Sequence, residues 1–341
     1  MNGRKERMKT EKKTKWQLFR KQGALQVFVW MGMIYLIIFN LIPMFGIIMG
    51  FKDYSITSGV KGIFTSPWVG MKWFREFVTD YKFGTLVRNT VMLSVLKLIF
   101  TFPLPILFAL MINEIHNYPF KKILQTCSYL PHFISWVIIS SISYQFLSQS
   151  GIINTLLQAL HLTSKPIGFL TEASKFWGLA VFLDVWKEMG WWTIIFLAAI
   201  TGISQDYYEA AEIDGASRLQ KIWYITLPCI KSTIVVVLIM TMGNLFGGGL
   251  SGSNFEQCYL LGNSVNAATS DIIQTYVFDV GLSQGRYAYA TAVGLIPVSY
   301  THLDVYKRQP ILRVICLPIS RCSMWGIVQS RRTAMDPFRK S

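Results

Sequence analysis

Long apolar runs alternate with shorter polar segments along this chain, and the length of the runs gives the first prediction. A helix needs about 20 mostly apolar residues to cross a hydrocarbon core of about 30 Å, because lipid does not tolerate unpaired backbone groups. The pattern therefore predicts an all-α membrane protein, a polytopic helical bundle of six spans with the sixth truncated. The predicted spans cover residues 24–50, 89–112, 124–147, 176–202, 232–250 and, incompletely, 287–298.

Composition agrees with a chain that lies mainly in lipid. Of 341 residues, 52% are hydrophobic and only 15% are charged, which is too apolar for an ordinary soluble domain. The first run, 24–50, carries no charge and exceeds the apolar core of a cleavable signal. We therefore expect it to remain as a membrane anchor.

The net charge of +15 could suggest a nucleic-acid partner, but the position of the charge favours an orientation signal. Nine Lys or Arg side chains precede the first span, and such a basic segment, residues 1–23, is typical of a cytoplasmic flank. We expect no nucleic acid. Five cysteines without a CxxC pair indicate neither a disulfide framework nor a zinc site, and we expect no metal or cofactor.

The predicted cytoplasmic loop at residues 203–231 has the pattern of a docking element. Asp206 can cap a first short helix, with Glu209 as its capping-box partner, and this helix should stop at Gly215. A small helical knob of this kind can fit a groove in a partner protein.

A second short helix should follow in the same loop, over residues 216–224. It should end before Pro228, because proline disfavours helical backbone in the residue ahead of it. The loop would then consist of two small helices joined by a tight glycine turn.

This loop resembles the cytoplasmic signature of the permease subunits of binding-protein-dependent ATP-binding-cassette importers. The signature is EAA, three residues, G, nine residues, then I, any residue, and LP. It is matched by Glu209, Ala210, Ala211, Gly215, Ile225, Leu227 and Pro228, with Asp214 directly before the glycine. Ile222 stands where phenylalanine is common, and Ser232 where a second proline often lies. Neither departure disturbs the glycine turn.

The resemblance implies a type I importer fold over about residues 24–295, in a bacterial cell membrane with a cytoplasmic N-terminus. It also implies that the loop inserts into a cytoplasmic ATPase. The chain contains no GxxxxGK[ST] phosphate-binding loop, so ATP hydrolysis would belong to a separate subunit. The other implied partners are a second permease, an extracytoplasmic binding protein and the lipid bilayer.

Further segments look like the branch of this family that imports oligosaccharides and polysaccharides. They are YLPHFISWVI at 129–138, DVWKEMGWWTIIFLAAITGI at 184–203, FEQCYLLGN at 255–263 and YATAVGL at 289–295. We therefore expect a sugar substrate. A non-sugar solute, a secondary transporter and a membrane-embedded transferase remain alternatives, although a secondary transporter gives no reason for the 203–231 loop.

Three charges lie within the predicted fourth span. Asp184, Lys187 and Glu188 share one helix face and can neutralise one another, and a lone charge at mid-membrane costs about 2.5 to 3.5 kcal/mol on insertion scales. With Trp191 and Asn244 they suit a carbohydrate path, but a salt-bridged structural network explains the charges equally well. Lys97, in the second span, should pair with a carboxylate such as Asp184 or Glu188. His132 is expected to be a hydrogen-bonded structural residue.

The C-terminal segment does not continue the pattern. Only about twelve apolar residues follow from Tyr287, which is about 18 Å of helix and too short to cross. The string VSYTHLDVYKRQ resembles a translated sequencing-adapter artefact. We therefore expect residues 296–341 to be non-native, and resequencing of the source locus should replace them with a continuing apolar segment.

Overall fold

The computed structural model describes residues 23–247 and 253–297, mainly as helices. The described part also contains one isolated antiparallel bridge between Lys52 and Trp68. The predicted basic N-terminal segment and the predicted non-native tail lie outside the described residues, except for Gly23 and the last two described positions. The chain forms two compact units, which are described separately.

The first unit comprises residues up to 77 together with 280–293. A continuous helical stretch, Gln26–Phe51, is long and apolar enough to cross a membrane and covers the predicted first span. In the segment that follows, the Phe51 ring stacks on Trp68 with centroids 5.7 Å apart. The unit contains α2 (Gly23–Leu36), η1 (Ile37–Leu41), α3 (Ile42–Met44), η2 (Phe45–Phe51), η3 (Ile56–Ser58), α4 (Gly59–Thr65), most of α5 (Lys72–Thr79) and the start of a helix over 287–297.

The second unit, residues 78–279 and from 294, contains most of the described helices. Its helices before the predicted cytoplasmic loop are α6 (Phe83–Thr101), α7 (Pro103–Asn113), α8 (Tyr118–Tyr129), η4 (Leu130–Phe133), α9 (Trp136–Leu147), α10 (Ile152–Ala159) and α11 (Ala173–Thr201). Those that follow are α12 (Gln205–Ile213), α13 (Arg218–Lys221), η5 (Ile222–Thr226), α14 (Leu227–Cys229), α15 (Lys231–Gly247), α16 (Ser253–Leu261), α17 (Ala267–Ser270) and α18 (Ile273–Phe278). The next element, η7 (Asp279–Ser283), lies mainly in the first unit.

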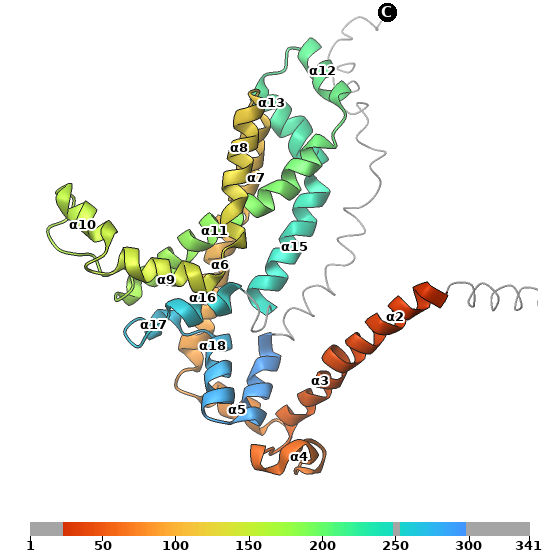
Figure 1. The fold of residues 1–341 in the computed structure, drawn as a ribbon, viewed down its shortest axis with the longest axis vertical. Coiled ribbons are helices and arrows are strands. Elements are labelled where there is room, and N and C mark those ends of the chain that lie inside the picture. The colour runs from red at the N-terminus through yellow and green to blue at the C-terminus, as the bar shows by residue number, and fades with distance from the viewer. Residues whose placement is uncertain (1–22, 248–252, 298–341) are drawn as a thin grey trace, which may run out of the picture. The chain divides into compact units, whose positions relative to one another are not determined.

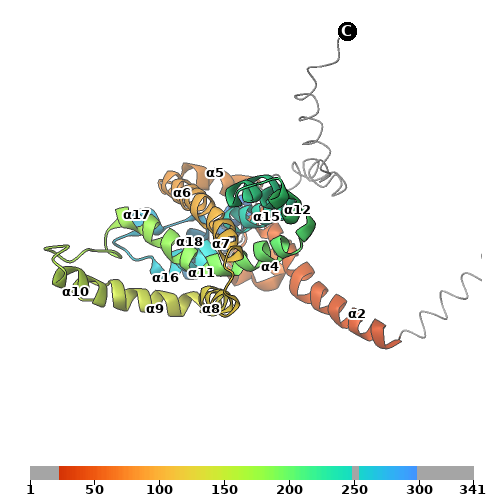
Figure 2. The ribbon, with the colours of Figure 1, turned by 90° about the horizontal axis from the view of Figure 1, so that it is seen from above.

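Helix α11 is the centre of this unit. It packs against α6 and α7, and also against α8 and η4, so it lies between these two pairs of elements (Figures 1 and 2). One apolar cluster joins the first half of α11, at Phe176 and Leu183, to Leu93 of α6 and Ile139 of α9. A second cluster lies around Phe196 and includes Ala109, Leu110, Ile200, Ile230 and Val237.

The apolar helices that can cross a membrane are fewer than the six predicted spans. In the described residues two helical stretches pass by length and composition, Gln26–Phe51 and Phe83–Asn113, and up to four pass if each of two bent pairs is one span. The bent pairs are Tyr118–Phe133 with Trp136–Ala159 and Arg218–Cys229 with Lys231–Gly243. Although α11 is 29 residues long, it is not among them, and it carries the three charges noted above.

The predicted third span, 124–147, is not a single continuous helix but is broken in two. The two halves meet at 97°. Pro131 lies inside the short 3-10 turn η4, and the break follows at Ile134 and Ser135, whose backbones are extended. The Ser135 hydroxyl accepts the Ile138 N–H at 3.4 Å and so starts the new helix α9.

Helices α8 and α11 touch at Gly190. A Cβ built at this position would lie 2.0 Å from the Ser128 carbonyl oxygen, a backbone atom that cannot turn aside. Only glycine therefore allows this approach, as small residues do elsewhere in membrane bundles.

We predict that Gly190→Ala destabilises the chain by at least about 1 to 3 kcal/mol, the usual range for overpacking, because α8 must move. The matched control is Gly178→Ala on the same helix, where a Cβ meets nothing within 4 Å. Thermal unfolding of both variants in detergent measures the difference. Equal melting temperatures would contradict the close approach.

Candidate functional site

A buried ion pair joins α6 to α11 in the middle of the second unit. The Lys97 ammonium group lies 2.9 Å from Asp184 Oδ1, and the side chains are 0% and 4% exposed. Thr101 donates a second hydrogen bond to Asp184 Oδ2 at 3.2 Å. Lys97 thus pairs with one of the two carboxylates predicted for it. The pair belongs to a buried polar stripe on α6 formed by Asn89, Thr90, Ser94, Lys97 and Thr101.

The other two charges of α11 are held by the break between α8 and α9. Lys187 donates to the His132 carbonyl oxygen and lies 3.5 Å from Glu188 Oε1. His132 Nδ1 lies 2.8 Å from Glu188 Oε2, and its ring stacks on Trp191 with centroids 4.3 Å apart and planes within 5°. We call Lys187, Glu188, His132 and Trp191 the central cluster. Its Glu188, His132 and Trp191 are part-exposed, so they border open space.

The sequence prediction for this site was therefore right about some contacts and incomplete about others. Asp184 bonds to Lys97 and Thr101, whereas the expectation that all three charges of α11 neutralise one another fails for Asp184. His132 is hydrogen-bonded, as expected, but its place beside Glu188 and Trp191 was not foreseen. The one sequence feature that could have indicated this role is its position next to Pro131, where a helix can break. The Asn244 side chain lies outside the described residues.

The 203–231 loop begins with α12, whose cap differs from the prediction. Ser204, and not Asp206, occupies the N-cap position, and its hydroxyl accepts the Asp206 N–H at 3.4 Å. Asp206 lies in the first turn, where a carboxylate is favourable because of the helix dipole. The helix ends at Ile213, and Gly215 then has a φ of +72°, as expected for a glycine turn.

The second half of the loop was also predicted incorrectly. The helix begins at Arg218, after a capping box between Ser217 and Gln220, and it does not end before Pro228. It continues through the π-helical turn η5 and through α14 to Cys229. In this wider turn the Leu227 N–H donates to the Ile222 carbonyl oxygen, which gives room for a proline that a regular α-helix would exclude.

Polar contacts hold together the two helical halves of the 203–231 loop, which we call the knob. Lys221 bonds to Glu212 across the glycine turn, and this hydrogen bond holds the pKa of Glu212 below its usual value. The Tyr208 hydroxyl lies 2.9 Å from Thr226 Oγ1, and burial raises the pKa of Tyr208. Behind them is a polar cavity of about 400 Å³, lined by residues such as Glu114 and Arg218.

The tip of the knob is apolar and exposed. Ile213 is 88% exposed and Leu219 is 69% exposed, on either side of the glycine turn, and Trp223 and Tyr224 continue this surface. Among the motif residues, Glu209, Asp214, Gly215 and Pro228 are exposed, while Ala210, Ala211, Ile225 and Leu227 are half-buried. Apolar side chains in this number on a charged loop indicate a contact surface.

Comparison with known proteins decides the family. The profile described as "Binding-protein-dependent transport system inner membrane component" matches residues 101–301. The chain belongs to this family. Its members are inner membrane components of transport systems, so the predicted family and the helical membrane fold are confirmed.

Two curated relatives are similar over most of the chain. Protein LplB of Bacillus subtilis (strain 168) is 44% identical over 265 residues, which are 77% of this chain and 80% of the relative. The polygalacturonan/rhamnogalacturonan transport system permease protein YteP of the same strain is 43% identical over 276 residues, 81% of this chain and 83% of the relative.

A solved structure of a bacterial transporter shares the fold. The chain is similar to a component of a bacterial ABC transporter involved in the import of the acidic polysaccharide alginate, with a TM-score of 0.79 and 36% identity. The match covers 88% of this chain and 98% of that chain. A second structure, of a bacterial alginate transporter in complex with an alginate pentasaccharide-bound periplasmic protein, matches with a TM-score of 0.76.

The buried ion pair yields a prediction for stability. Lys97→Met should destabilise the chain by about 3 to 5 kcal/mol, because it leaves the Asp184 carboxylate buried without its counter-charge. The double variant Lys97→Met/Asp184→Leu removes both charges and should recover most of this loss. Thermal unfolding of the two single variants and the double variant measures the coupling. Additive losses in the double variant would show that the two charges do not depend on each other.

Proposed function

We propose that this chain is one of two permease subunits of an ATP-driven importer and that it passes oligosaccharides, or fragments of polysaccharides, across the cell membrane. The observation that carries the proposal is the 203–231 loop, an exposed apolar knob with a complete match to the family signature, on a chain shown to belong to that family. The names of the relatives support the substrate class, because both YteP and the alginate transporter act on polysaccharide-derived material.

The knob would dock on a cytoplasmic ATPase. Ile213 and Leu219 would enter its groove. The ion pair between Lys221 and Glu212 would hold α12 and α13 together when the ATPase moves. Because the sequence contains no phosphate-binding loop, the ATPase subunit would hydrolyse ATP and this chain would only transmit the movement. A cytoplasmic position of both the loop and the N-terminus is proposed, and the basic segment 1–23 supports it under the positive-inside rule.

The central cluster would form part of the solute path. Broken helices at membrane depth are tolerated where they line a cavity, and they build the substrate sites of many transporters. Here the break brings a carboxylate, Glu188, beside the stacked rings of His132 and Trp191. A carboxylate binds sugar hydroxyls, and an aromatic face packs on a sugar ring. Asp184, paired with Lys97 and almost fully buried, is instead assigned to the structural frame.

The docking loop can be tested at its glycine. Gly215→Val should abolish ATP-dependent uptake while leaving membrane insertion intact, because a β-branched residue is strained at a φ of +72°. Uptake is measured in cells that carry all subunits of the importer, and insertion is measured from the amount of chain in the membrane fraction.

Two controls make this test specific. Gly215→Asn should retain much of the uptake, because asparagine adopts the left-handed conformation more readily. Gly202→Ala, at a φ of −79° just before the knob, should have little effect. Full uptake by Gly215→Val would refute the docking role of the loop.

The solute path gives a separate prediction. Glu188→Gln and Trp191→Ala should weaken transport more than they weaken stimulation of the ATPase by the loaded binding protein, because the docking loop stays intact. Both rates are measured in proteoliposomes that contain the complete importer. Normal import by both variants would favour the alternative in which the cluster is only a structural network.

A further inference from the structure

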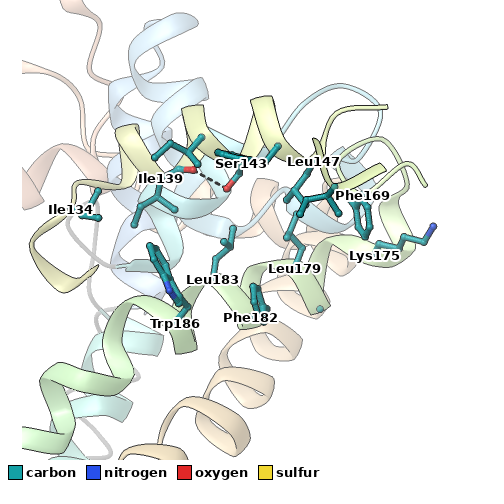
Figure 3. Close-up of a pocket in the computed structure, with 14 residues that line it drawn as sticks. Ile134, Ile139, Ser143, Leu147, Phe169, Lys175, Leu179, Phe182, Leu183 and Trp186 are labelled. Atoms are coloured by element: carbon teal, nitrogen blue, oxygen red, sulfur yellow. Dashed lines mark hydrogen bonds between the residues drawn. The ribbon is translucent and has the colours of Figure 1, made fainter. Parts of the chain in front are cut away.

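An apolar groove of about 740 Å³ opens between α9 and the first half of α11 (Figure 3). Ile139 and Leu147 of α9 line one wall, and Leu179, Phe182 and Leu183 of α11 line the other. It belongs neither to the central cluster nor to the knob. Trp186 lies at one end and Lys175 at the other, where Phe169 also lies (Figure 3).

The lining excludes a sugar or a chain of water molecules as the occupant. Apart from Lys175 and the indole N–H of Trp186 at the opposite end, the polar side chain in this lining is Ser143, and its hydroxyl already donates to the Ile139 carbonyl oxygen at 2.8 Å. Sugar hydroxyls would enter the groove without hydrogen-bond partners, at a cost of about 1 to 3 kcal/mol each. The occupant must therefore be hydrocarbon-like.

The length and the ends of the groove match one leaflet of a bilayer. From Lys175 to Trp186 the helix rises about 16 Å, which is about half of a hydrocarbon core of about 30 Å. The Lys175 stem lines the groove while its ammonium group points away from it (Figure 3), as lysines do at the membrane surface. Trp186 is adjacent in sequence to the mid-membrane charges at Lys187 and Glu188.

Helix α10 supports the same assignment. Ile152, Leu156 and Leu160 are spaced one turn apart and are more than half exposed, so they form an apolar stripe that the described residues leave largely uncovered. Residues 123–164 contain no Asp, Glu, Lys or Arg, although a loop in water would carry charge. A helix with one exposed apolar stripe that packs against α9 suits the boundary between headgroups and acyl chains.

We propose that the groove holds one acyl chain of an outer-leaflet phospholipid, whose phosphate group meets the Lys175 ammonium, with α10 lying in the headgroup region beside it. The assignment to the outer leaflet rests on the orientation proposed above, whereas the lipid site itself does not. Lys165, exposed and beyond α10, adds a second cation on the same connection. The pair formed by Lys175 and Glu172, at 2.7 Å and half-exposed, can open to a phosphate at little cost.

The groove offers a variant that fills it without disturbing the protein. Gly178 lines the groove, and a Cβ built there meets nothing within 4 Å, so Gly178→Leu should occupy the acyl-chain space and also favour the helix. Gly84→Leu is the matched control, since Gly84 is an equally open helical glycine on α6.

The test measures quenching of Trp186 fluorescence by phosphatidylglycerol brominated on its acyl chains. The full chain is purified with its partner subunits, and subtraction of the Trp186→Phe variant isolates the signal of this residue. We expect saturable quenching that Gly178→Leu abolishes and Gly84→Leu retains. Lys175→Gln should raise the half-saturating lipid concentration about fivefold, as loss of one interfacial cation predicts.

Three results would overturn the proposal. Quenching that rises linearly with lipid would indicate simple contact with the surrounding bilayer. Unchanged quenching in Gly178→Leu would place the lipid elsewhere. Absence of a Trp186 signal in the complete importer, with a signal in the isolated chain, would show that a partner subunit covers the groove. Because lipid is brominated in both leaflets, a wrong orientation cannot produce any of these results and is detected separately by proteolysis of the loops.

Discussion

The fold depends on the neutralisation of charge inside an apolar bundle. Helix α11 carries Asp184, Lys187 and Glu188, and each unpaired charge at mid-membrane would oppose its insertion. The helix can therefore lie in the membrane only when other helices surround it. Its neighbours supply what it needs: α6 provides Lys97 and Thr101, and the turn η4 provides His132. The central position of α11 follows from this requirement.

The break between α8 and α9 and the charges of α11 stabilise each other, because the break exposes a backbone carbonyl group and α11 carries a buried ammonium group. A helix that ends inside a membrane leaves carbonyl groups without donors, which is costly in lipid. The His132 carbonyl oxygen, at the end of η4, receives its hydrogen bond from Lys187. Lys187 also lies 3.5 Å from Glu188 Oε1, while the other oxygen of Glu188 bonds His132 Nδ1. Neither the break nor the lysine would be tolerated alone.

Features that depend on a long or local pattern were accessible from the sequence. The run over 24–50, the second span around Lys97 and the turn at Gly215 each follow from composition or from a fixed spacing. Where two neighbouring residues suit the same structural role equally well, the sequence alone does not show which of them takes it. Ser204 and Asp206 are both good cap residues, and the end of α11 at Thr201 decides between them.

The same limit explains the errors around the two prolines. A proline indicates that a helix is disturbed, but not how. At Pro131 the chain breaks a few residues later, because Lys187 and Ser135 satisfy the freed backbone groups. At Pro228 the helix continues, because the preceding turn is π-helical, with the Leu227 N–H donating to the Ile222 carbonyl oxygen. Contacts with other helices determine both outcomes. His132 likewise belongs to the candidate site only because it contacts Glu188 and Trp191 of α11.

The arrangement also explains how a movement of the knob can reach the central cluster. Helix α11 runs without a break or a proline from Ala173 to Thr201, and Ser204 starts the knob only three residues later. Glu188 and Thr201 are 13 residues apart on this helix, a rise of about 20 Å. A rigid helix of this length can transmit a displacement of the knob to the central cluster. Because α8 touches α11 closely at Gly190, α8 would move together with α11. On the proposed function, the residues that would contact solute and those that would dock on the ATPase are connected by this one helix, which the buried pair between Lys97 and Asp184 joins to α6.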